Sequence, residues 1–342
     1  MHRPLRLIID SAALVQNWRA LADHAGVPAG AAIKADAYGL GAHEALRTLY
    51  DAGCRDFFVA IWAEAEALGS IPSDAALSVL HGVGAKDVQA ALNSTARPVL
   101  NTVEQVGRWK EAAPRRPCDV MIDTGMNRLG LRPEEVAVLD GLSIETLHTH
   151  LACADEDHEL NGRQLQRFRE VASFVPAKRY SMANSAGIFL GRDYSFDLVR
   201  PGLALYGGIP RPEAQATIRQ VAHVEAQVVQ RRTIRAGESC GYGGTFVAGA
   251  ETEAAILNIG YADGYLRGFS SKGAAFVGEY ALPVLGRVSM DLIAVGCDAA
   301  PGLREGEWVE IDYDLPTAAE ASGLSQYELL TSLGSRFERR WA

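Results

Sequence analysis

The sequence predicts an α/β fold, a (β/α)8 barrel of the TIM type followed by a mostly antiparallel β domain. Over the first 207 residues, short apolar runs alternate with amphipathic stretches, which is typical of parallel strands joined by helices. After about residue 217 the runs become short strands separated by glycines, which is typical of antiparallel sheet. We therefore place the barrel at 1–217 and the β domain at 218–342, with residues 1–10 also able to pack with the second domain.

The apolar runs that give the barrel its strands can be counted from residue 30. They lie at 30–35, 56–61, 77–82, 97–101, 118–123, 143–151, 178–184 and 202–207, with a further strand at 6–10 left over. Helices are expected between them at 11–26, 42–52, 63–69, 85–93, 102–113, 133–140 and 158–175. Ser11 is the expected cap of the first helix. In the second domain we expect strands in runs such as VAHVEAQVVQ and WVEIDY, and helices near 316–322 and 325–334.

The amino-acid composition limits the kinds of partner that the protein is expected to bind. The chain has 342 residues, with 33 basic and 42 acidic side chains and a net charge of −9, which argues against nucleic acid or an anionic membrane as the main partner. It has no apolar run of about 18 residues, so we expect no transmembrane helix, and MHRPLRLIID is not followed by a long apolar segment, so we expect no secretory leader. The five cysteines lack CxxC spacing, so we expect free thiols and a cytoplasmic protein: Cys54, Cys118, Cys153, Cys240 and Cys297. A small-molecule substrate is the expected partner.

A lysine stands at the end of the first barrel strand, in AAIKADAYG. Barrel active sites lie at the C-terminal ends of the strands, and a lysine in an apolar run is rarely buried without a partner or a role. Desolvation would lower the pKa of the Lys34 amine, as a Schiff-base lysine requires. The run is also compatible with a lysine that extends to the barrel rim.

The segment AAIKADAYGLG, with Lys34 and Tyr38, resembles the pyridoxal-phosphate lysine motif of the alanine racemases. Seven further segments are similar to motifs of that family and follow in its order: DTGMNRLG (123–130), THLACADE (149–156), ANSA (183–186), VRPGLALYG (199–207), GYGGTF (241–246), IGYADG (259–264) and GRVSMD (286–291). The resemblance implies an enzyme that interconverts L-alanine and D-alanine by two-base proton transfer on a pyridoxal 5'-phosphate Schiff base. The family fold, a barrel followed by a β domain, agrees with the independent prediction.

The resemblance also implies roles for individual residues. Lys34 binds the cofactor and is the base for the D-enantiomer, while Tyr242 acts on the L-enantiomer and comes from the other subunit of a homodimer. Arg200 faces the pyridine nitrogen and leaves it unprotonated, because a guanidinium only donates hydrogen bonds. The other implied cofactor contacts are Tyr38, Ser185, Gly202 and Leu203 at the phosphate, with His150 and Asn184 in support. Arg128 and Met290 bind the substrate carboxylate, and the polar entrance comprises Asp155, Tyr261, Arg267 and Arg287.

Three positions depart from the family pattern. Met121 stands where many members carry a carbamylated lysine that positions the arginine corresponding to Arg128. Ser181 stands where a histidine commonly supports the arginine at the pyridine nitrogen. In a loose alignment, Ser335 stands where some members place a second pocket tyrosine. These changes bear on substrate range and rate more than on reaction type.

Other functions remain open on the sequence. A broader-specificity racemase would carry the same motifs. A related pyridoxal-phosphate decarboxylase of basic amino acids shares the barrel and the lysine, but it uses an acidic partner for the pyridine nitrogen where this chain has Arg200. A metal-dependent hydrolase would use His148, His150, Cys153, Asp155 and His158. A non-catalytic pyridoxal-phosphate protein would not need the β domain. Whether the activity serves cell-wall synthesis or alanine breakdown is also open.

Overall fold

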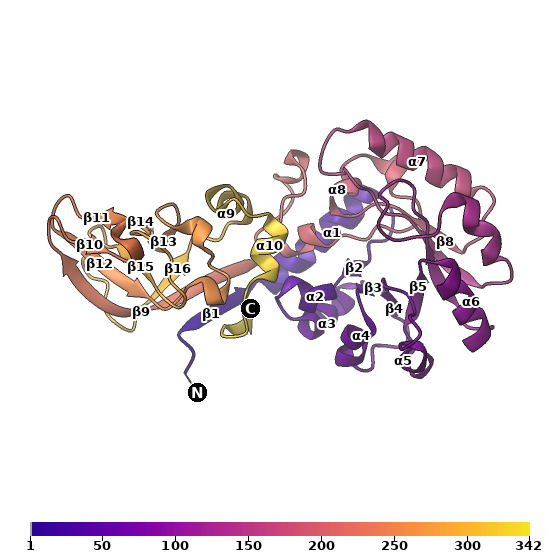
Figure 1. Cartoon of the computed structure of the whole chain (residues 1–342), viewed down its shortest axis with the longest axis horizontal. Helices are drawn as coiled ribbons and strands as arrows, with labels where there is room; N and C mark the ends of the chain where they lie inside the picture. The colour runs from indigo at the N-terminus through magenta and orange to yellow at the C-terminus, as the bar shows by residue number, and fades with distance from the viewer. Residues whose placement is uncertain (1) are drawn as a thin grey trace. The chain divides into compact units, whose positions relative to one another are not determined.

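The computed structural model describes residues 2–342, which divide into two compact units. The first, the barrel unit, comprises Leu14–Leu205 and Ile209–Ile218. The second, the β unit, comprises the residues up to Ala13 together with Tyr206–Gly208 and Arg219–Ala342. Figure 1 labels most of the helices and strands of both units.

Parallel strands form the centre of the barrel unit. Their order follows the sequence, from β2 to β8. The strands are β2 (Ala31–Ala32), β3 (Asp56–Val59), β4 (Ala76–Val79), β5 (Arg97–Leu100), β6 (Cys118–Met121), β7 (Ile144–His148) and β8 (Arg179–Ser181). Every residue of β3 and β6 is buried, as expected for parallel strands covered on both faces. The predicted fold class is confirmed, and each strand lies within or beside its expected run.

An irregular segment, 197–201, lies between β8 and β2. The Arg200 amide donates to Ala183 O at 2.9 Å on the β8 side. On the β2 side, Ala32 N donates to Pro201 O and Gly30 N donates to Val199 O, both at 2.9 Å. The expected strand at 202–207 is therefore wrong, because most of it is the short 3-10 helix η3 (Leu203–Tyr206). The preceding residues take the eighth position, since their amides and carbonyls face both neighbours.

The helices of the barrel unit, except the short α8, lie at the positions that their amphipathic patterns predict. They are α1 (Ser11–Ala25), α3 (Ala42–Ala52), α4 (Trp62–Leu68), α5 (Val88–Asn93), α6 (Val103–Ala112), the 3-10 helix η1 (Pro133–Leu139), α7 (Glu159–Ala172) and α8 (Ser185–Ile188). The cap of α1 differs from the prediction. The Asp10 carboxylate, rather than Ser11, accepts a hydrogen bond from Ala13 N at 2.8 Å.

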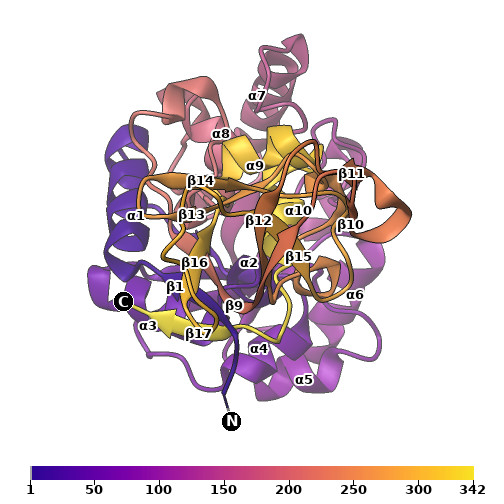
Figure 2. The same cartoon turned by 90° about the vertical axis from the view of Figure 1, so that its left-hand side faces the viewer.

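The β unit is built around the long strand β9 (Ala222–Ile234), which pairs with three antiparallel neighbours. These are β1 (Leu5–Ile9), β12 (Thr252–Leu257) and β16 (Trp308–Ile311). Val224 of β9 is opposite both Leu7 and Ile311, and all three are buried, so this row is part of the core. Figure 2 shows β9, β12 and β15 (Ile293–Gly296) along one another.

The remaining elements complete the β unit. They are the hairpin β10 (Ser239–Cys240) and β11 (Phe246–Val247), the strands β13 (Ala274–Val277), β14 (Tyr280–Pro283) and β17 (Glu338–Trp341), and the helices α9 (Leu315–Ser322) and α10 (Gln326–Thr331). The first strand of the chain, β1, lies between β9 and β17 and runs parallel to β17. The sequence did not predict β17.

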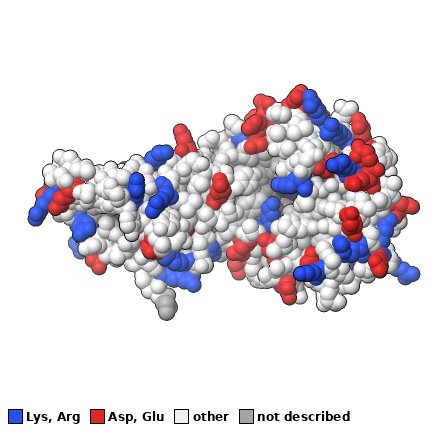
Figure 3. Space-filling view, in the orientation of Figure 1, with Lys and Arg blue, Asp and Glu red and all other residues white. Residues whose placement is uncertain are grey.

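Three further observations concern the surface charges, the cysteines and the length of the helices. On the face in Figure 3, lysine and arginine side chains are interspersed with aspartate and glutamate. All five cysteines are free thiols. In the part of the chain that the structure describes, no helix has the length and apolar character needed to span a membrane.

Candidate active site

A left-handed turn follows β2 and carries two of the expected site residues. This is α2 (Lys34–Tyr38), in which four consecutive residues have φ between 51° and 57°: Ala35, Asp36, Ala37 and Tyr38. A left-handed residue other than glycine costs about 1–2 kcal/mol, because its Cβ crowds the following carbonyl oxygen. The turn begins at Lys34 and ends at Tyr38. One strained segment thus positions both side chains.

The Lys34 amine lies in an electropositive, desolvated environment. Burial lowers its pKa, and the charges of Arg128 and Arg200 lower it further, while Glu64 opposes them. The sequence predicted this direction. A lower pKa leaves more of the amine neutral at a given pH, which a nucleophilic or basic lysine needs.

A narrow cradle lies beside the end of the turn. A Cβ atom added at Gly202 would lie 2.1 Å from the Tyr38 hydroxyl oxygen, so a larger residue there would displace the Tyr38 ring. The Ser185 hydroxyl accepts hydrogen bonds from the amides of Gly202, at 2.9 Å, and Ala204, at 3.1 Å. Hydroxyls and backbone amides are the groups that bind a phosphate. Leu203, the residue between Gly202 and Ala204 in the sequence, is buried.

Arg200 is buried under the same end of the barrel, with 7% of its surface exposed. Its guanidinium donates to the Ser181 hydroxyl and, at 2.7 Å, to the Thr149 carbonyl. Ser181 therefore supports this arginine directly, at the position where the family commonly has a histidine. Burial lowers the pKa of Arg200 to about 10, and the Asp119 charge opposes that shift. No carboxylate contacts the guanidinium among residues 2–342.

The two side chains expected to support Arg200 have other surroundings. His150 makes no hydrogen bond with Arg200, whose guanidinium bonds to other groups. The pKa of His150 is lowered to about 3, mainly by burial and further by the charges of Arg200, Arg128 and Lys34. Asn184 caps α8, because its side chain accepts from Gly187 N at 2.9 Å. The neutral imidazole and the cations Arg128 and Arg200 make this end of the barrel suited to anionic groups.

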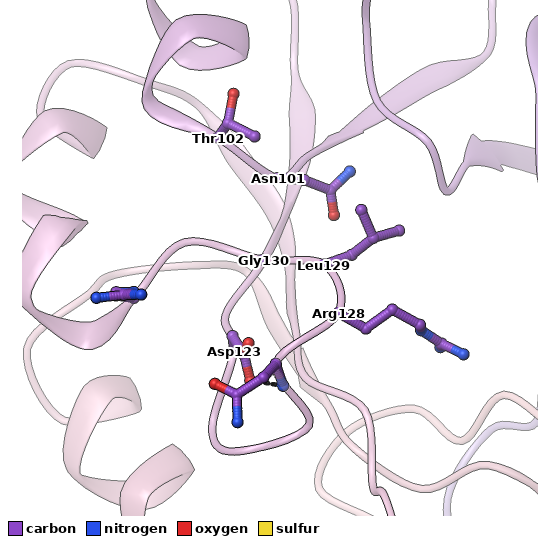
Figure 4. A pocket seen from close by; sticks show the side chains of 8 residues that line it. Asn101, Thr102, Asp123, Arg128, Leu129 and Gly130 are labelled. Atoms are coloured by element: carbon purple, nitrogen blue, oxygen red, sulfur yellow. Dashed lines mark hydrogen bonds between the residues drawn. The ribbon is translucent and has the colours of Figure 1, made fainter.

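The loop after β6 carries Arg128. Asp123 organises it by accepting hydrogen bonds from Gly125 N at 2.8 Å and Asn127 N at 3.1 Å. The loop borders a pocket of about 250 Å³, and the Arg128 side chain extends away from Asp123 in Figure 4. Within residues 2–342, Arg128 makes no hydrogen bond or ion pair, and Met121 is buried beneath the loop near Gly130. The Arg128 guanidinium is thus free to bind an external carboxylate.

The remaining expected residues, except Asp155, lie in the β unit. Tyr242 is 65% exposed in the short glycine-rich turn η5 (Tyr242–Gly244), and the exposed Arg287 lies against Gly243. A second group forms where Ala262 N donates to Met290 O and Tyr261 N to Ser289 O, both at 3.0 Å. The Arg267 guanidinium lies 5.5 Å from the centre of the Tyr261 ring. Asp155 is exposed in the barrel unit.

The structure divides the expected residues between the two units. The barrel group comprises Lys34, Tyr38, Arg128, His150, Asn184, Ser185, Arg200, Gly202 and Leu203. Three participants were missed from the sequence: Glu64 beside Lys34, Thr149 on Arg200, and the buried Asp119. Only Glu64 had a detectable signal, because it is an acidic residue in the first turn of α4, three residues after the N-cap residue Ile61. The side chains of the hydrolase alternative do not form a cluster of three or more metal ligands in residues 2–342.

A buried acid–histidine pair lies in the barrel interior. His148 Nε2 is 3.9 Å from Asp119 Oδ2, and both side chains are fully buried. Burial first, then Arg200, lowers the pKa of His148 to about 4, although Asp119 opposes this. Burial raises the pKa of Asp119, but His148, Arg97 and Ser78 outweigh it and lower the pKa to about 2. The pair therefore contains a neutral histidine and an ionised aspartate at neutral pH.

This pair predicts an acid-sensitive fold. The folded pKa of His148 is below its unfolded value of about 6.5, so the unfolded chain binds more protons and stability falls as pH drops from about 6.5 towards 4. We expect His148 to cost about 2 kcal/mol of unfolding free energy between pH 7 and pH 5. Urea unfolding of the cofactor-free protein at both pH values should show a smaller loss in His148→Gln. The exposed His43→Gln variant is the control; equal losses in all three proteins would contradict the prediction.

Comparisons with known proteins give the same family for both units of the chain. Residues 9–210 match the family model described as alanine racemase, N-terminal domain, and residues 221–341 match alanine racemase, C-terminal domain. A relative from Agrobacterium fabrum named "Alanine racemase, catabolic" is 42% identical, covering 98% of this chain and 91% of its own. An alanine racemase from Methylobacterium nodulans is 41% identical, with coverages of 98% and 95%. A solved alanine racemase from Bartonella henselae, with covalently bound pyridoxal phosphate, superposes with a TM-score of 0.92 at 36% identity over 100% of both chains.

Proposed function

The chain belongs to the alanine racemase family, and from this premise we propose that it interconverts L-alanine and D-alanine as a pyridoxal-phosphate-dependent isomerase. The observation that carries the proposal is the lysine at the end of β2 with a lowered pKa, beside Arg200 and the cradle at Gly202. These residues fit the cofactor: an amine for its aldehyde, a donor for its ring nitrogen and a hydroxyl-and-amide cradle for its phosphate.

The barrel group would hold the cofactor. Lys34 would carry it covalently, and Arg200 would face the pyridine nitrogen. Ser185, Tyr38 and the amides at Gly202 and Leu203 would bind the phosphate. When bound, pyridoxal phosphate supplies an electron sink that makes the Cα–H bond of an attached amino acid acidic enough to break. Arg200 bonds to neutral acceptors and stays a donor, which favours racemisation over the decarboxylase alternative with its acidic partner.

Two bases account for inversion at Cα. Lys34, made more often neutral by burial and by Arg128, would remove or return the proton on the face of the D-enantiomer. The Tyr242 hydroxyl would do the same on the face of the L-enantiomer. The exposure of Tyr242 on the β unit supports a role toward a neighbouring molecule, so we propose a homodimer in which each subunit supplies Tyr242 to the other.

The substrate would be bound by its carboxylate. Arg128, unpaired within residues 2–342, and the backbone amide of Met290 are the proposed contacts. His150 and Asn184 would support the site, and the entrance would be lined by Asp155, Tyr261, Arg267 and Arg287. A cytoplasmic location is supported by the five free cysteines, which suit a reducing compartment.

A racemisation assay tests the proposed function. The purified holoenzyme should convert either pure enantiomer of alanine to the racemate, as followed by chiral chromatography. Across a panel of L-amino acids, alanine should give the highest kcat/KM. Release of carbon dioxide from lysine or ornithine, without change of configuration in alanine, would instead identify a decarboxylase.

A further inference from the structure

We propose that Glu64 is a positioning residue that holds Lys34 and Tyr38 by anchoring the left-handed turn α2. The inference rests on the proposed function, because it takes Lys34 to carry the cofactor. Glu64 lies in α4, on the connection after the neighbouring strand β3. It touches no expected substrate group, so it acts through the turn and through its charge.

The Glu64 carboxylate joins two segments of the barrel unit. Its Oε1 atom accepts a hydrogen bond from Ala35 N at 2.7 Å, directly after Lys34. Its Oε2 atom accepts from Ala60 N at 2.6 Å and Ile61 N at 3.4 Å, where the chain leaves β3 and enters α4. One side chain thus ties the first amide of the strained turn to the neighbouring strand end. Bonds to an ionised acceptor are the strong ones.

The turn needs such an anchor because its own backbone disfavours it. Ala35 to Tyr38 all lie in the left-handed region. Several backbone bonds support the turn, among them those from Ala37 N to Ile33 O and from Gly39 N to Ala35 O, both at 2.9 Å, and from Gly41 N to Asp36 O at 2.8 Å. The Asp36 side chain adds an acceptor for Ala42 N at 2.7 Å. Strained backbone persists only where its surroundings over-determine it, and Glu64 adds a side-chain hydrogen bond from α4 to the first amide of the turn.

Glu64 also contributes charge at Lys34. The charged groups facing the amine are Arg128 from the loop after β6, Arg200 from segment 197–201, and Glu64 from α4, with the imidazole of His150 at the end of β7. Glu64 is the acidic member of this set, and it raises the pKa that burial and the two arginines lower. Removing its charge should therefore lower the pKa of Lys34 further. If Glu64 only capped α4, its replacement would leave the pKa of Lys34 unchanged.

The variant Glu64→Gln tests both effects. A glutamine keeps one oxygen and presents an NH2 group to the other backbone amide, so it loses one short bond and the charge. Cofactor added to the cofactor-free variant should bind roughly 10- to 100-fold more weakly. The pH profile of Lys34 acylation, read by peptide mass spectrometry, should move to lower pH. Glu135→Gln is the matched control, because Glu135 accepts from Arg132 N at 2.8 Å in a similar cap away from Lys34.

A second substitution separates anchoring of the turn from general destabilisation. Glycine adopts the left-handed region freely, so Ala35→Gly should have little effect alone but should recover about 5- to 10-fold of the affinity in Ala35→Gly/Glu64→Gln. If Glu64→Gln does not fold, restored folding in the double variant supports the proposed anchoring role of Glu64. A double variant that also fails to fold overturns that role. The anchoring role would also be overturned if Glu64→Gln bound the cofactor within twofold of wild type and showed an unchanged pH profile of Lys34 acylation. Equal effects of Ala35→Gly on cofactor affinity in the wild type and in Glu64→Gln would overturn it too. A wild-type protein whose cofactor is not on Lys34 would overturn the proposed function instead.

Discussion

Replacing Lys34 by alanine is expected to abolish covalent cofactor attachment and to lower racemisation by more than about 10⁴-fold. The expectation follows from its two roles, as the amine that carries the cofactor and as the base on one face of Cα. Both depend on the same neutral amine at the end of β2, whose pKa is lowered by burial and Arg128. The visible absorbance of the lysine-linked cofactor should disappear in Lys34→Ala, although the phosphate cradle is intact.

The attachment site can be read directly in the wild-type protein. After borohydride reduction, peptide mapping should find the pyridoxyl group on Lys34. The control is Lys178→Ala, which removes a lysine that instead pairs with Glu145 at 2.5 Å and should retain absorbance and activity. A pyridoxyl group on Lys110 or Lys178 would show that the site has been assigned to the wrong lysine.

Removal of the Tyr242 hydroxyl is expected to make proton exchange asymmetric. In Tyr242→Phe, Lys34 and the cofactor site are untouched, so D-alanine in heavy water should gain α-deuterium while keeping its configuration. Exchange from L-alanine should fall by about 10² to 10⁴, because the base on its face is lost. The control is Tyr280→Phe, since Tyr280 is a similarly exposed tyrosine of the β unit. Equal losses from the two enantiomers would contradict the two-face assignment.

The same variants test whether the site is shared between subunits. If Tyr242 comes from the partner, mixing inactive Lys34→Ala and Tyr242→Phe dimers should restore activity, because each hybrid dimer contains one intact site. Subunit exchange is followed with a mass-tagged chain by native mass spectrometry. Hybrids that form but stay inactive would show that each site is built within one chain.

Much of the barrel and of the site could be predicted from the sequence, because local patterns carry that information. The helix expected at 42–52 is α3 with the same bounds, since its apolar stripe and flanking glycines are local features. The buried strands follow from apolar runs, and the lowered pKa of Lys34 follows from its place in one of them. The family motifs, read in order, led to the cofactor and the reaction.

Other features depended on contacts between distant segments. The eighth barrel position went to 197–201 rather than 202–207, because the amides and carbonyls of the former face both β8 and β2. Ser181 became the partner of Arg200, and Asp119 became a buried acid near His148, through packing across strands. Tertiary structure also decided the left-handed turn at Ala35 and its anchor Glu64. Four residues that prefer the right-handed region adopt the opposite hand only because a carboxylate from α4 and the surrounding barrel hold them there.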